Sequence, residues 1–154
     1  MIAIAIPNSV LAAVEDQARA AFPHECCGYL VGPATGTAVD AIVACRNAQA
    51  DGTHPTAPER TAKTGFVIAD EELFAFARSF DTPRPARIVY HSHTNGRAYF
   101  SSVDRQVARL AQYPVQHLVV GVTALGVTQS AQFAWVPEVS DFVEVSRWTT
   151  PVLR

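Results

Sequence analysis

Two histidines and one aspartate have the spacing that best fits a chemical site. His91 and His93 are separated by one residue directly after an apolar run, and Asp104 follows eleven residues later. On a β-strand, alternate side chains point to the same side, so both imidazoles would face one way with backbones about 6–7 Å apart. Asp104 would come from the first turn of a following helix. Two imidazoles and one carboxylate suit zinc and leave a fourth tetrahedral position open, as in catalytic zinc sites.

The same residues also have purely structural interpretations. A His-x-His pair at a strand end is more often a pair of solvated polar residues than a metal site. Ser101 and Asp104 also match the S-x-x-D pattern of a helix N-terminus, in which the serine oxygen accepts a backbone N–H and the acidic side chain lies in the first turn. Spacing alone leaves both interpretations open.

Taken together, these motifs resemble the JAMM (MPN-plus) family of zinc metalloproteases. The residues H-S-H at 91–93, seven residues, and then S-x-x-D at 101–104 match the metal motif of that family. An upstream glutamate accompanies the motif, and PHECCGYLVG at 23–32 is similar to the P-x-E-x-C-G-x-L-x-G of the compact bacterial members. Thr94 and Phe100 stand where most relatives have proline, a departure that concerns the loop rather than the ligands.

The resemblance implies a site and a mechanism. His91, His93 and Asp104 would hold one Zn²⁺, which makes a water acidic enough to attack a carbonyl near neutral pH. Glu25 would take the proton from that water and deliver it to the leaving amine. Ser101 would hydrogen-bond the developing oxyanion.

The resemblance also implies a substrate, the C-terminal tail of a ubiquitin-like protein. The chain is most similar to the compact Mec-type hydrolases, which remove an amino acid or short extension after the diglycine end of a sulfur-carrier protein. A deconjugating isopeptidase of a bacterial ubiquitin-like pathway and a non-catalytic MPN interaction module are the alternatives, and a homodimer stays open. An extended tail would pair with a strand edge near residues 60–67.

The surrounding sequence predicts an α+β fold for a single domain over residues 1–154. Mixed order followed by a late run of strands indicates a mixed central sheet flanked by two or three helices, as in the JAB1/MPN, cytidine-deaminase-like architecture that the resemblance implies. Helices are predicted at 9–22, 70–80 and 101–112, and strands at 26–32, 38–45, 87–90, 115–122, 129–136 and 141–145. Residues 2–6 and 66–68 are compatible with short strands, and residues 46–65 with a long loop.

The second predicted helix has a clear apolar pattern. Asp70 is expected to cap its N-terminus. Leu73, Phe74, Ala77 and Phe80 recur near helical spacing and are expected to form its buried face.

Several further residues are weighed against structural roles. Arg97 and Tyr99 lie between the ligands and are candidates for substrate contact, with a solvated loop face as an equal alternative. Cys26, Cys27 and Cys45 are an odd set that predicts no disulfide framework, and core packing is favoured for them.

Composition limits the partners. The chain has 12 basic and 14 acidic residues and a formal net charge of -2, with no basic cluster. Nucleic acid is disfavoured as a partner because phosphate binding needs a clustered basic face. No apolar stretch reaches the roughly 18–20 residues of a membrane-spanning helix, and the start lacks the basic residues of a secretory signal. We therefore expect a cytoplasmic protein with reduced thiols.

Overall fold

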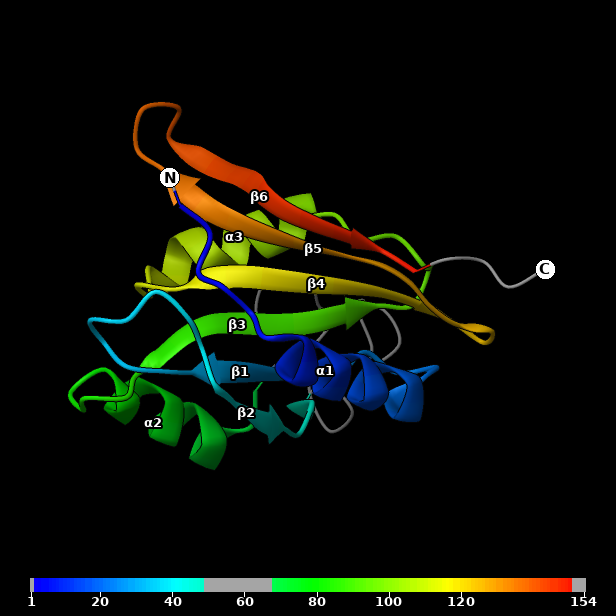
Figure 1. Cartoon of the computed structure of the whole chain (residues 1–154), viewed down its shortest axis with the longest axis horizontal. Helices are drawn as coiled ribbons and strands as arrows, with labels where there is room; N and C mark the ends of the chain where they lie inside the picture. Colours follow the sequence, from blue (N-terminus) through cyan, green and yellow to red (C-terminus); the bar gives the residue numbers. More distant parts are fainter. Residues whose placement is uncertain (1, 49–67, 151–154) are drawn as a thin grey trace.

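Six strands form one sheet in the order β2-β1-β3-β4-β5-β6 in the computed structural model, which describes residues 2–48 and 68–150 (Figure 1). The strands are β1 Cys27–Val31, β2 Ala41–Cys45, β3 Ala86–His93, β4 Gln116–Thr123, β5 Gly126–Val136 and β6 Asp141–Thr149. All neighbouring strands are antiparallel except β3 and β4, which run parallel and are joined through α3, Ser102–Ala111. The sheet is therefore mixed, as the sequence predicts.

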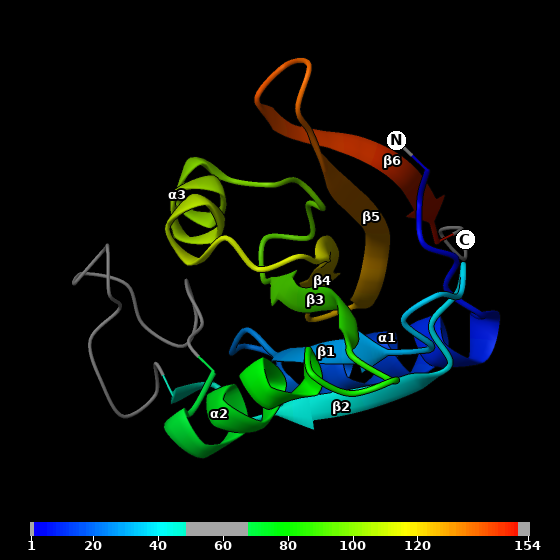
Figure 2. The same cartoon turned by 90° about the vertical axis from the view of Figure 1, so that its left-hand side faces the viewer.

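Helices cover both faces of the sheet. The helix α1, Asn8–Ala21, lies on one face, while α2, Asp70–Ser79, and α3 lie on the other (Figure 2). Ile88 and Tyr90 of β3 belong to the apolar cluster under α1, whereas Val89 belongs to the cluster under α2. Because side chains alternate along a strand, His91 follows Val89 to the face that carries α2 and α3.

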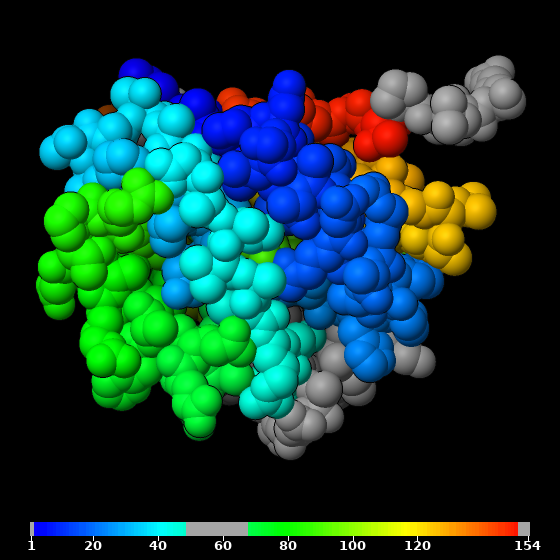
Figure 3. Space-filling view, turned by 60° about the horizontal axis from the view of Figure 1, so that its bottom comes forward, coloured from blue at the N-terminus to red at the C-terminus, as the bar shows by residue number. Residues whose placement is uncertain are grey.

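The apolar stripe of α1 explains both its formation and its position. Its buried residues are Val10, Leu11, Val14 and Ala18, which share one side of a helix. The helix ends at Ala21, before Phe22 and Pro23, since proline supplies no backbone N–H to continue it. On the surface, α1 and the β2 segment lie next to each other (Figure 3).

Residues 2–6 do not form the short strand that the sequence suggests. Ala5 makes one isolated parallel bridge to Ala38. The backbone of Ile4 is instead bound by buried side chains, because its N–H donates to Gln116 Oε1 at 3.0 Å and its carbonyl accepts from Gln132 Nε2 at 2.9 Å. Glutamine side chains take the place of a strand partner here.

Two predictions about α2 are wrong. The N-cap is Ala69, whose extended backbone precedes the first helical turn, so Asp70 is the first helical residue and makes no capping bond. Phe76 is the buried residue of the helix, while Phe74 is 68% exposed and Ala77 is also exposed. Leu73, Phe76 and Phe80 form the side of α2 that packs on the sheet, and Phe74 points away from that side.

Other predictions fall partly outside the described residues. These are most of the loop predicted at 46–65, the strand edge near 60–67 and most of the strand at 66–68. The described end of that segment, Ile68, forms a bridge with Asn47. The strands β5 and β6 extend beyond the predicted ranges. Within the described ranges, no helix is long and apolar enough to cross a membrane.

Candidate metal centre

The C-terminal end of β3 brings two imidazoles together. His91 and His93 point to the same side of the sheet, and their Nε2 atoms are 3.1 Å apart. Both side chains are almost fully buried, with exposed fractions of 2% and 5%. Ring nitrogens at this distance can share a hydrogen bond if one of them is protonated, and a cation between them would instead bind both lone pairs.

The first turn of α3 supplies a carboxylate to this pair. Ser101 is the N-cap of α3, and its Oγ accepts the Asp104 N–H at 3.0 Å while its own N–H donates to Asp104 Oδ2 at 2.9 Å. The same carboxylate lies 3.2 Å from His91 Nε2 and 3.1 Å from His93 Nε2. The capping arrangement and the His-His-Asp group therefore coexist, and the cap orients the carboxylate.

The three side chains are spaced closely enough to hold one metal ion. Zinc binds imidazole nitrogen and carboxylate oxygen at about 2.0–2.2 Å, so tetrahedral ligand atoms stand roughly 3.3–3.6 Å apart. The separations of 3.1 and 3.2 Å come close to this spacing. One ligand atom from each residue lies within 4.8 Å of the others. The group could hold one metal ion with a coordination position left open.

The protonation of the group also suits a metal. His93 Nδ1 lies 3.2 Å from the Arg97 carbonyl oxygen, which can only accept, so Nδ1 carries the proton and Nε2 keeps a lone pair. Burial lowers the pKa of His93 and favours the neutral ring. Burial alone would raise the pKa of Asp104, but the imidazoles of His91 and His93 hold it well below its usual range. Asp104 is therefore ionised.

Glu25 reaches this region from the start of β1. Cys26 donates its N–H to Ser92 Oγ at 2.8 Å, and Ser92 donates its N–H to the Cys26 carbonyl at 3.1 Å. Continuing this antiparallel register by one residue places Glu25 opposite His93, on the side of the sheet that carries the ligands. Glu25 as a residue is 5% exposed, and its backbone carbonyl accepts from Asn47 Nδ2 at 3.0 Å. The register thus brings a buried carboxyl beside the ligands.

The loop between the second histidine and α3 is held by backbone contacts. Asn95 Oδ1 accepts the Arg97 N–H at 3.0 Å, and Gly96 between them has φ +77°. Thr128 Oγ1 donates to the Gly96 carbonyl. A Cβ at Gly121 would lie 2.5 Å from the carbonyl carbon and oxygen of Gly96, so only glycine lets β4 approach this closely. Sequence reasoning missed Gly121, although a glycine within the apolar run of β4 signals such an approach.

Two loop side chains lie against the ligands. The Tyr99 ring packs on the His93 ring with centroids 4.6 Å apart, and Tyr99 is 41% exposed. The Arg97 guanidinium lies 5.5 Å from the centroid of the Tyr99 ring. Both candidates for substrate contact are therefore next to the metal group.

An apolar cleft of about 240 Å³ approaches the ligands between α2 and α3. Residues of α3 line it from Val103 to Ala111, so His91 and Asp104 mark the end at the N-terminus of α3. Other lining residues include Ile68, Leu73, Phe76, Val107 and Tyr113. His117 also lines the cleft and packs against Phe100 and Phe142, with ring centroids 4.9 and 5.2 Å apart.

The three cysteines pack in the core. Cys26 lies in the cluster under α1, and Cys27 and Cys45 lie in the cluster under α2. Burial raises the pKa of the Cys26 thiol to about 11 and that of Cys45 to about 12. Neutral thiols are poor metal ligands and nucleophiles. No cysteine belongs to the metal-binding group found among the described residues.

Comparisons with known proteins agree with this fold. The chain is similar to a solution structure of a protein from Salinibacter ruber, with 23% identity, a TM-score of 0.60, and coverage of 90% of this chain and 86% of that one. A solution structure from Desulfitobacterium hafniense has 20% identity, a TM-score of 0.56, and coverage of 90% and 87%. A comparison with curated proteins finds no match.

The family comparison covers the whole candidate site. The model of the prokaryotic homologs of the JAB domain matches residues 7–136, a range that contains Glu25, both histidines, Ser101 and Asp104. The match extends over more than half of the chain. The chain therefore belongs to the prokaryotic homologs of the JAB domain.

Proposed function

We propose that this protein is a zinc-dependent peptidase or isopeptidase that cleaves at the C-terminus of a small ubiquitin-like sulfur-carrier protein, after its diglycine end. One observation supports the proposal: the His-His-Asp group lies beside the N-cap serine of α3 and borders an apolar cleft. The register of β1 and β3 adds a buried glutamate opposite His93. A module that served only as a scaffold would have no need of this combination.

The chain's own residues supply proton transfer and charge stabilisation. His91, His93 and Asp104 would hold the zinc ion, which would supply Lewis acidity and lower the pKa of a water toward neutrality. Glu25 takes a proton from the attacking water and delivers it to the departing amine. Ser101 donates its hydroxyl hydrogen to the carbonyl oxygen as negative charge develops, a contribution often worth about 2.7–4 kcal/mol per donor.

The cleft supports an extended tail as the substrate. Its lining is mostly apolar, so an apolar side chain ahead of the scissile bond would be buried there while the backbone passes the ligands. The sulfur-carrier identity follows from the resemblance of the motifs to those of the compact bacterial hydrolases. Deconjugation of a ubiquitin-like protein is the nearest rival because it uses the same tail.

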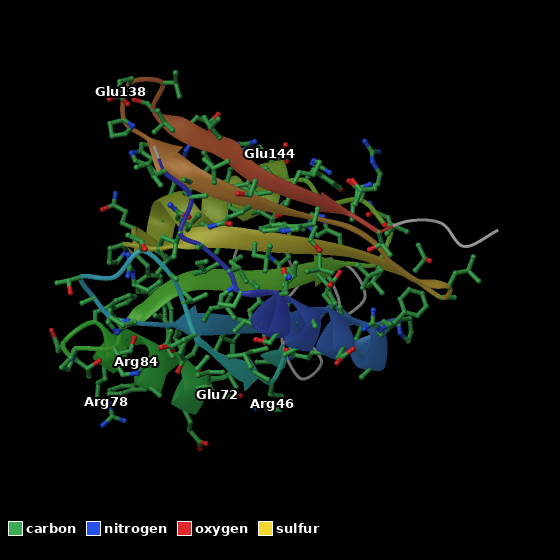
Figure 4. The ribbon with its side chains drawn as sticks, viewed as in Figure 1. Arg46, Glu72, Arg78, Arg84, Glu138 and Glu144 are labelled. Carbon is green, nitrogen blue, oxygen red and sulfur yellow. The ribbon has the colours of Figure 1, made fainter. Side chains whose placement is uncertain are left out.

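Metal analysis and one substitution test the proposal. We expect the purified protein to bind one zinc ion per chain, and E25Q to keep the zinc while losing hydrolysis of a carrier protein extended by one residue. E138Q is the matched control, because Glu138 lies at the exposed β5–β6 turn far from the ligands (Figure 4). Failure to load zinc, or unchanged turnover by E25Q, would contradict the proposal. Preference for a lysine-linked adduct over the extended carrier would favour deconjugation.

A further inference from the structure

Arg97 has a guanidinium that no acidic side chain neutralises among the described residues. Three other arginines on neighbouring elements are paired: Arg105 and Arg109 with Asp141, and Arg147 with Glu144. Arg97 is exposed, and the contact of its guanidinium is the face of Tyr99 at 5.5 Å. An exposed arginine stacked on an aromatic ring keeps its donors available for an anion.

The position of Arg97 is tied to a metal ligand in two ways. Its carbonyl oxygen contacts His93 Nδ1 at 3.2 Å, and the ring on which its guanidinium lies packs on the His93 ring at 4.6 Å. The backbone at Gly96 and Arg97 is pressed against β4 at Gly121, which holds the start of the side chain in place. A single aromatic ring, that of Tyr99, thus separates the guanidinium from the ligand His93.

Arg97 lies outside the apolar cleft, although it is close to one of the ligands. The cleft is lined by His91 and Asp104, whereas Arg97 and Tyr99 are reached through His93 and do not line it. If the apolar part of a peptide fills the cleft and its scissile bond lies at the ligands, the part beyond that bond lies outside the cleft, where Arg97 is the nearby exposed cation.

From this arrangement we infer that Arg97 binds the terminal carboxylate of the amino acid or short extension that is removed. The inference rests on the proposed hydrolytic function. The carboxyl carbon of a single leaving residue is only one residue, about 3.3–3.6 Å, beyond the scissile carbon. Arginine binds carboxylates through two parallel hydrogen bonds. Hydrolysis breaks the C–N bond, adds water, and releases a carrier carboxylate and an amino acid whose own carboxylate is held by Arg97.

This assignment makes the protein a trimming enzyme with carboxypeptidase specificity. A lysine side chain in an isopeptide bond carries no carboxylate one residue from the scissile carbon. Substrates that present a free C-terminus immediately after the cleaved bond are bound better than internal or lysine-linked ones. Arg97 therefore selects trimming over deconjugation.

The test measures binding in addition to turnover. Zinc-loaded E25Q is titrated with fluorescein-labelled Leu-Val-Gly-Gly-Ala that ends in a free carboxylate or in an amide. We expect amidation to weaken binding by about 10-fold or more, as for loss of a charge-assisted pair. In E25Q/R97Q the two peptides should bind within about twofold of each other, and E25Q/R97K should lie between.

A matched control separates the carboxylate contact from loss of a surface cation. Arg78 is also exposed and lies 5.5 Å over an aromatic ring, that of Phe74, but its side chain points away from the body of the molecule on α2 (Figure 4). E25Q/R78Q should keep the full effect of amidation. An equal effect of amidation with and without Arg97, or no binding of either peptide at millimolar concentration, overturns the inference.

Turnover by the protein with Glu25 intact distinguishes the two proposals. If Arg97 discriminates the carboxylate in binding but neither peptide is hydrolysed, the hydrolase proposal fails and the carboxylate site stands. If the free and amidated peptides are hydrolysed equally fast, the hydrolase proposal stands and the role of Arg97 is wrong.

Discussion

Substituting Gly121 by alanine tests whether close backbone packing holds a candidate metal ligand. Gly121 pairs with His93 across β3 and β4. An added Cβ would lie 2.5 Å from the carbonyl carbon and oxygen of Gly96 and 2.8 Å from the Arg97 nitrogen. All three are backbone atoms, so the loop must move away from β4 to restore ordinary contact distances.

The expected effect of G121A on zinc affinity and stability follows from the contacts that the Gly96–Arg97 loop makes. Movement of the Gly96–Arg97 peptide would weaken the bond from Thr128 Oγ1 to Gly96 and the contact between the Arg97 carbonyl and His93 Nδ1. Loss of a partner that orients a ligand typically lowers metal affinity about 10–100-fold. Overpacking adds roughly 1–3 kcal/mol of destabilisation. For a chain of this size that lowers Tm by about 2–10 °C.

Chelator competition measures zinc affinity, and thermal unfolding of the metal-free protein measures the packing cost. G36A is the matched control, because an added Cβ there meets its nearest neighbour, Pro33, at 3.3 Å on a surface turn. T128V removes the hydroxyl bonds without adding volume and should lower zinc affinity only a few-fold. Wild-type zinc affinity and Tm in G121A would refute the reasoning about the loop.

Three further predictions follow from burial, capping and protonation. F76A should destabilise the protein by about 3–5 kcal/mol in urea unfolding, because Phe76 is buried, whereas F74A should cost less than about 0.5 kcal/mol. S101A should lower the stability of the metal-free protein by roughly 0.5–2 kcal/mol, since the cap of α3 is lost, and it should also slow hydrolysis while zinc stays bound. Burial lowers the pKa of His117 to about 3, so the unfolded chain, with a histidine pKa near 6.5, binds the extra proton. The free energy of unfolding therefore decreases as pH falls below about 6.5, by no more than about 1.4 kcal/mol per pH unit for His117. Because the His117 ring is only half-buried, solvent makes this decrease smaller. Urea unfolding of metal-free H117Q at pH 7 and pH 5 should show a smaller loss than the parent protein; an equal loss would assign the pH dependence elsewhere.

Local pattern was sufficient to predict that His91 and His93 share a side, that Asp104 begins a helix, and the order of the elements, whereas the assignment of the three as metal ligands came from the family resemblance. His91 and His93 share a side because alternation is a property of any extended backbone, and Asp104 lies near them because S-x-x-D begins a helix. Family membership and the mixed sheet with helices on both faces are confirmed. The roles of Glu25 and Ser101 stay predictions until activity is measured.

Local pattern failed where several faces of one element are apolar. Phe74 and Phe76 both fit a helical repeat, and only contact with Tyr29 of β1 and Tyr113 beyond α3 selects Phe76. Residues 2–6 alternate like a strand, yet buried glutamines bind the backbone of Ile4. Which phenylalanine is buried, and which groups bind the backbone of Ile4, depends on contacts with residues distant in the sequence.

The sequence by itself determined which donors this protein has and that two of them face one way, because residues close in the chain are related by backbone geometry alone. Only the tertiary structure decided that Glu25 lies opposite His93, through the register that Cys26 and Ser92 establish between β1 and β3. It also decided that Gly121 lets the loop approach β4, and that Arg97 lies one ring away from a ligand. These relations join residues distant in sequence, and only strand pairing and close packing bring such residues together.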